Sequence, residues 1–125
     1  MAFLVDANVI IRFLMGTPED QFSKSIDIFK SIEEAKIDVY IMDTVLMEVF
    51  FVLTKFYKIP KKIVIDDLKA ILLLDGVINS DKALLVEVLN VIKEKNIDFV
   101  DAQICVKKRL QNFDAISFDK DILKC

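Results

Sequence analysis

The chain contains no histidine and only two glycines, Gly16 and Gly76. Without histidine, neither imidazole acid–base catalysis nor a serine–histidine–aspartate triad is available. Two isolated glycines cannot form the glycine-rich loop that cradles nucleotide phosphates. Any chemistry must therefore use carboxylates, lysines or a bound metal ion.

Cysteine is also scarce, with only Cys105 and Cys125 present. The first falls in a helical pattern and the second is the last residue, so we expect two thiols rather than a disulfide or a zinc site. The apolar runs VFFVL and AILLL are far shorter than the roughly 18 residues of a membrane-spanning helix. The N-terminus, MAFLVD, has no basic lead and is a poor signal peptide. We therefore expect a cytoplasmic protein with no membrane segment.

A length of 125 residues fits a single domain, 1–125, with one proper core. The hydrophobic fraction of 54% predicts a large core or an apolar surface reserved for a partner. A net charge of -3 argues against general coating of nucleic acid, although a local basic path remains compatible with it.

Short apolar segments alternate with segments of helical periodicity along the chain. This alternation predicts an α/β fold with a mostly parallel sheet, and such sheets carry their sites at the carboxyl ends of the strands. Asp6 and Asp119 each follow a predicted strand. Strands are expected at 3–5, 38–42, 76–78 and 113–117, and helices at 8–14, 19–35, 43–57, 60–74, 80–95 and 98–110 and from 119.

Each acidic residue near a predicted helix start also has a purely structural explanation. Asp6 could cap the first helix, although Asn8 is an equally good cap. Asp98 as the cap and Asp101 in the first turn would give the helix over 98–110 a favourable electrostatic start, and Asp119 and Asp121 could likewise cap the last helix. Glu48 could share a narrow solvent stripe with Thr44 and Lys55, or point into a polar cleft at the sheet edge.

Taken together, these acids favour a site. Clustered carboxylates repel one another and raise each other's pKa, and a divalent cation is the usual compensation. Mg²⁺ and Mn²⁺ prefer carboxylate and water ligands. Such an ion can activate water and stabilise charge on a phosphodiester without any histidine.

Four segments resemble the motifs of PIN-domain ribonucleases, of the kind found as VapC toxins in toxin–antitoxin pairs. They are FLVDANVIIRFL, DTVLMEVFFVL, DFVDAQICV and AISFDKDILK, and their order and spacing match the family over nearly the whole chain. The resemblance implies a three-layer sandwich around a central, mainly parallel sheet. It also implies endonucleolytic hydrolysis of single-stranded RNA with one or two Mg²⁺ or Mn²⁺ ions.

Carried over by position, the resemblance implies that Asp6, Glu48 and Asp101 are the core metal ligands and that Asp119 is a fourth, more variable acid. The remaining matched positions are polar or charged side chains that support the acids or face substrate phosphate. They are Asn8, Thr44, Ser117, Asp98 and Asp121 as supporting residues, and Arg12 as an RNA contact.

Two positions depart from the family pattern. Ala7 stands where many relatives have serine or threonine, and the chain stops at Cys125, where relatives usually add another strand. Without that additional strand, the last edge of the sheet and some of the substrate contacts would differ from those of the relatives. As partners we expect single-stranded RNA, a second copy of the chain in a homodimer, and a cognate antitoxin.

Other basic and aromatic clusters have two interpretations each. The basic residues that end the helix over 98–110 either stabilise its dipole or contact RNA. The aromatic run is either core or a platform for base stacking, and its density could also reflect an interface with a dimer partner or an antitoxin. These clusters are Lys107, Lys108 and Arg109, and Phe50, Phe51, Phe56 and Tyr57.

The same residues do not fit two other classes of protein. A haloacid-dehalogenase-type phosphatase needs Asp-x-Asp after its first strand, whereas this chain has Asp6-Ala7-Asn8. The acids and late lysine of a phospho-receiver domain are also missing. Two alternatives stay open: a catalytically silent PIN-like interaction module, and a PIN nuclease that processes RNA rather than acting as a toxin.

Overall fold

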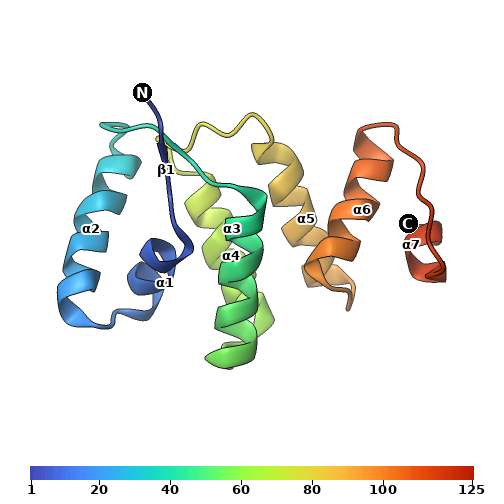
Figure 1. Cartoon of the computed structure of the whole chain (residues 1–125), viewed down its shortest axis with the longest axis horizontal. Helices are drawn as coiled ribbons and strands as arrows, with labels where there is room; N and C mark the ends of the chain where they lie inside the picture. Colours follow the sequence, from blue (N-terminus) through green and yellow to red (C-terminus); the bar gives the residue numbers. More distant parts are fainter. The chain divides into compact units, whose positions relative to one another are not determined.

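The computed structural model describes all residues, Met1–Cys125, as two compact units, Met1–Ser80 and Asp81–Cys125 (Figure 1). Helices dominate both units, and the strands are short. The first unit contains β1 (Phe3–Leu4), α1 (Ala7–Met15), α2 (Glu19–Glu33), β2 (Val39–Tyr40), α3 (Asp43–Phe51), the π-helical turn η1 (Val52–Phe56) and α4 (Lys61–Leu72); the second contains α5 (Lys82–Glu94), α6 (Phe99–Leu110) and α7 (Lys120–Lys124).

The first unit carries a small parallel sheet, in which β1 pairs with β2. The strand predicted at 76–78 is reduced to a single parallel bridge between Val39 and Val77. Beyond it, the buried side-chain amide of Asn79 pairs with the backbone of Ile41: its Oδ1 accepts from the Ile41 N–H at 2.9 Å and its Nδ2 donates to the Ile41 carbonyl at 2.7 Å. The α/β class is thus confirmed, with a sheet of two strands, whereas the three-layer sandwich stays a prediction.

Gly76 stands at a close approach of two backbones. A Cβ built there would lie 2.5 Å from the Ile37 carbonyl oxygen and 2.6 Å from that of Ile32. The Gly76 N–H donates to the Ile32 carbonyl at 2.8 Å. Only glycine leaves room for the chain to pass so near the end of α2.

The core of the first unit lies between α1, α2, α3 and α4. Apolar residues recur at helical spacing along each of these helices, which gives each one an apolar side to bury. Phe13 of α1 stacks on Phe29 of α2 with ring centroids 4.2 Å apart. The fully buried side chains include Ile10, Ile32, Leu46, Ile65, Leu68 and Leu72.

The helix predicted over 43–57 is continuous in the structure as α3 followed by η1, but two of its aromatic rings are exposed. After Phe51 the backbone widens into η1, where Thr54 Oγ1 donates to the Phe50 carbonyl at 2.7 Å. A hydroxyl that bonds back to the preceding turn competes with the regular helical pattern. Phe51 and Phe56 are 61% and 76% exposed, so the core interpretation is wrong for both of these rings.

In the second unit α5 packs against α6, with Leu85, Leu89 and Val106 fully buried. The helix α5 begins at Lys82, after Asp81 in the cap position, two residues later than the start predicted at residue 80. The strand predicted at 113–117 is wrong, because this segment pairs with no other strand and leaves Phe113 exposed. An apolar stretch becomes a strand only where a partner supplies its backbone hydrogen bonds.

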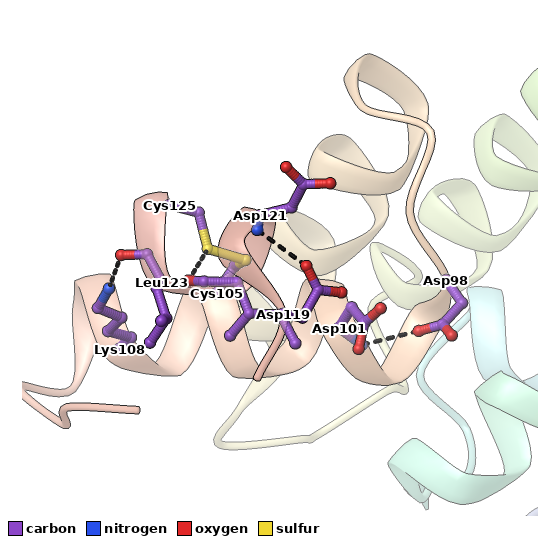
Figure 2. The surroundings of a disulfide bond; sticks show 9 residues. Asp98, Asp101, Cys105, Lys108, Asp119, Asp121, Leu123 and Cys125 are labelled. Carbon is purple, nitrogen blue, oxygen red and sulfur yellow. Dashed lines mark hydrogen bonds between the residues drawn. A yellow bond between two sulfur atoms is a disulfide. The ribbon is translucent and has the colours of Figure 1, made fainter. Parts of the chain in front are cut away.

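The expectation of two thiols is also wrong. Cys105 and Cys125 form a disulfide with their Cα atoms 5.5 Å apart (Figure 2). After α6 the chain turns back, and α7 lies along that helix. This return brings together two cysteines that are 20 residues apart in the sequence.

Candidate metal-binding site

Asp98 and Asp101 open α6 with different roles. Asp98 has extended backbone angles at the cap position, and its Oδ1 accepts from the Asp101 N–H at 2.9 Å. Asp98 is therefore confirmed as the cap of α6, and its carboxylate is engaged in this hydrogen bond. Asp101 lies one turn into the helix, and a hydrogen bond joins its side chain to that of Asp98.

Asp119 and Ser117 order the start of α7. Asp119 Oδ1 accepts from the Asp121 N–H at 2.8 Å, which confirms Asp119 as the cap of this helix. Ser117 Oγ accepts from the Asp119 N–H at 2.9 Å and so fixes the backbone that carries the carboxylate. Asp121 is exposed on the first turn.

Asp101 and Asp119 approach each other within the second unit (Figure 2). Burial raises the pKa of Asp101 above its usual value, and the negative charges of Asp98 and Asp119 raise that pKa further. Both carboxylates line a cavity of about 410 Å³, together with Asp121, Lys95 and Lys124. Burial is therefore the first cause of the raised pKa of Asp101, and repulsion by the neighbouring acids of the second unit is the second.

Asp6 occupies the cap position of α1 directly after β1, but its side chain makes no capping hydrogen bond. Asn8 lies inside the helix, so it is not the cap either, contrary to the sequence expectation. Capping alone therefore does not account for Asp6, whose carboxylate is exposed.

Glu48 is exposed on α3, the helix that packs against α1. Thr44, Glu48 and Lys55 are all exposed, as the solvent stripe predicts, although Lys55 belongs to the π-helical turn. At the start of α3, the Thr44 N–H donates to Asp43 Oδ1 at 2.8 Å, so Asp43 rather than Thr44 provides the side-chain bond there.

The basic residues have partners of their own. Arg12 Nε donates to Gln21 Oε1 at 2.8 Å. Arg109 forms an ion pair with Glu87 at 2.8 Å, and Lys108 Nζ donates to the Leu123 carbonyl at 2.7 Å. A structural role is therefore shown for these last two side chains. The lysines at the acidic cavity, Lys95 and Lys124, were missed in the sequence, because only the return of α7 brings them there.

No group of three or more metal-binding side chains comes together in the structure. The second unit by itself supplies the pair Asp101 and Asp119 in a cavity open to water. Mg²⁺ commonly keeps several water ligands and binds through one or two carboxylates plus substrate phosphates. The donor chemistry of this pair therefore fits a hard divalent cation.

A carboxylate pair in a chain without histidine suits metal-assisted hydrolysis. The family model for the PIN domain matches residues 3–125, and the chain belongs to the PIN-domain family. PIN domains are generally nucleases and typically use divalent metals. No curated protein and no solved structure matches the chain significantly. None of the helices combines the length and the apolar character that crossing a membrane requires.

Proposed function

We propose that the protein is a metal-dependent endoribonuclease that hydrolyses single-stranded RNA. The observation that carries this proposal is the Asp101–Asp119 pair, two carboxylates held at one cavity in a chain of a nuclease family. Repulsion between these charges disfavours the arrangement unless a cation offsets it.

In the second unit, Asp101 and Asp119 are the proposed ligands of Mg²⁺ or Mn²⁺, and in the first unit the family resemblance supports Asp6 and Glu48 as ligand positions. These carboxylates would hold a divalent ion, which would supply activation of water at neutral pH and stabilisation of the negative charge on the phosphate. Asp101 contributes a carboxylate that is not used for capping, and Asp6 contributes one that makes no capping bond.

The supporting residues act through position. Ser117 holds the backbone of Asp119, and Asp98 caps the start of the helix that carries Asp101. Asn8 on α1 and Thr44 on α3 are exposed polar side chains, as is Asp121 on α7. Arg12, on the last turn of α1, is the proposed phosphate contact, and on substrate binding it would exchange Gln21 for a phosphate oxygen.

In its biological role we propose that the protein is the toxin of a toxin–antitoxin pair, a three-layer PIN sandwich that forms a homodimer and binds a cognate antitoxin in the cytoplasm. The resemblance to VapC-type toxins supports this role, and the exposed apolar side chains supply surface for protein partners. A PIN nuclease of RNA processing and a silent PIN-like module are the alternatives.

Cleavage of an unstructured RNA mixture tests the proposal. Purified protein is incubated with Mg²⁺ or Mn²⁺, and separately with EDTA. We expect products only with metal, near-complete loss in Asp6→Asn and Asp101→Asn, and a smaller loss in Asp119→Asn. Asp38→Asn and Asp114→Asn are matched controls, because both acids are exposed and neither belongs to the proposed ligand set.

Three outcomes would count against this function: equal cleavage with and without EDTA, no cleavage with either metal across varied RNAs, or equal loss in the control variants. Lack of cleavage in a protein that still binds metal would favour the silent interaction module.

A further inference from the structure

The Cys105–Cys125 disulfide closes a loop of the chain that contains the proposed metal ligand Asp119. It joins α6 to the residue that follows α7, and both cysteines line the same cavity as Asp101 and Asp119. In Figure 2 the Asp119 carboxylate lies between the disulfide and Asp101. The covalent link and the acidic pair therefore belong to one local structure.

Few other contacts hold α7 against α6. Ile122 is the one buried side chain of this helix, and Lys108 adds a hydrogen bond to the Leu123 carbonyl. The preceding segment contributes little, because Ile116 and Phe118 are fully exposed. A five-residue helix is not stable in water by itself, so its position depends on these attachments.

We propose that the Cys105–Cys125 disulfide is a redox-reversible clasp that positions Asp119 beside Asp101 and thereby controls divalent-cation binding at their cavity. The proposal rests on the proposed nuclease function. Closed, the clasp keeps both carboxylates at one site; open, it leaves Asp101 on α6 and frees Asp119 to move with α7.

The opening step is ordinary thiol–disulfide exchange with a dithiol reductant. A thiolate of the reductant attacks one protein sulfur, the protein S–S bond breaks, and the other cysteine leaves as a thiolate that takes a proton. The second thiol of the reductant then displaces the remaining cysteine. The reductant leaves as a disulfide, having given up two electrons, and the protein gains two thiols. A disulfide oxidant reverses the sequence and closes the clasp.

The test measures Mn²⁺ binding by the full chain, with the paramagnetic signal of free Mn²⁺ as the readout. Three forms are compared: the oxidised protein, the protein reduced with an excess of a phosphine, and Cys125→Ser. A mass change of about two hydrogens reports the opening of one disulfide. We expect the Kd for Mn²⁺ to rise at least ~10-fold in both open forms, as when a metal ligand loses the contacts that orient it. Amide hydrogen exchange over 111–125, measured without metal, should become faster in the same two forms.

Asp119→Asn separates positioning from general stability. If the clasp acts through Asp119, opening it in this variant should change Mn²⁺ affinity no further, although exchange over 111–125 should still accelerate. Should Cys125→Ser fail to fold, the reduced wild-type protein provides the open form.

The outcomes are distinct. Equal Mn²⁺ affinity in the oxidised and open forms overturns the clasp and leaves the nuclease proposal standing. A full additional loss in the Asp119→Asn background also overturns it, because the disulfide would then act through stability alone. Absence of Mn²⁺ binding in every form, joined to absence of RNA cleavage, overturns both proposals.

Discussion

The backbone N–H of Asp101 donates to the side chain of Asp98 across 2.9 Å, so two acids within one helical turn have separate roles. Asp98 caps the start of α6, whereas Asp101 lines the cavity that it shares with Asp119. Because one acid supports the fold and the other faces the cavity, substitutions at the two positions should have different effects.

Replacement of Asp98 should affect stability through the cap. Asp98→Ala should lower the free energy of unfolding by about 1 kcal/mol, within the range of about 0.5–2 kcal/mol for a lost N-cap, whereas Asp98→Asn should cost little because asparagine caps equally well. Urea unfolding at neutral pH measures both variants. Equal destabilisation by alanine and asparagine would mean that the charge of Asp98, not its hydrogen bond, is what α6 requires.

Asp101→Asn should melt at the same temperature as wild type or slightly above it, in EDTA at neutral pH. The pKa of Asp101 is raised in the folded state, so its ionisation destabilises the fold above that pKa. Because the group is only half-buried, solvent screening should keep the gain below ~1 kcal/mol, or below about 4 °C in a domain of this size.

This gain should depend on pH. It is present at neutral pH and should disappear as the pH falls through the raised pKa of Asp101 to below the ordinary aspartate value, where folded and unfolded chains are both protonated. Calorimetry over a pH series checks the sign. A variant less stable than wild type at neutral pH would show that the charged Asp101 stabilises the fold in some other way.

Metal ions should stabilise the wild-type protein by mass action. At an ion concentration of 100 times Kd the gain is about 2.7 kcal/mol. Thermal melts with millimolar Mg²⁺ or Mn²⁺ should therefore shift upward, and Asp6→Asn and Asp101→Asn should show a smaller shift or none. If the acids served only as helix caps, no variant would respond to metal.

Asn79 is expected to be the most sensitive polar residue of the first unit. Asn79→Ala would leave the buried N–H and carbonyl of Ile41 without this side-chain partner, at about 1–3 kcal/mol for each group that stays unsatisfied. Asn90→Ala is the matched control, because the Asn90 amide reaches Glu87 only at 3.5 Å. Similar losses of stability in the two variants would contradict the special role of Asn79.

A homodimer should scatter light with about twice the chain mass of 14.4 kDa at micromolar concentration. Substitution of an exposed aromatic residue, Phe51→Ser or Phe56→Ser, should weaken this association if α3 and η1 lie in a C2 interface, since each change acts twice there. A monomer over a wide concentration range would leave the exposed apolar surface to an antitoxin.

The helices could be predicted from local signals, because helical periodicity and capping act over a few residues. Asp98 and Asp119 were predicted as caps for this reason, and both are. The strand at 113–117 failed because its apolar residues do not reveal whether a partner strand is present. Likewise, Asn79 shows no local sign that its amide will pair with Ile41.

For the candidate site, the sequence indicated the acids but not their surroundings. Asp101 and Asp119 were grouped by family resemblance, and the structure shows them as neighbours. The disulfide was missed because it depends on the path of the chain after α6, which no periodicity encodes. The lysines of the cavity depend on the same path.

The two sides of the small sheet are closed to different degrees. On the side of β2, the bridge to Val77 and the side-chain amide of Asn79 provide backbone hydrogen bonds. On the other side, β1 has no second neighbouring strand, and Phe3 and Leu4 are 55% and 71% exposed. An uncovered apolar edge of this kind recruits strands from other molecules. Concentrated preparations should therefore aggregate through β1. The substitution Leu4→Lys should improve solubility, and it changes none of the proposed catalytic residues.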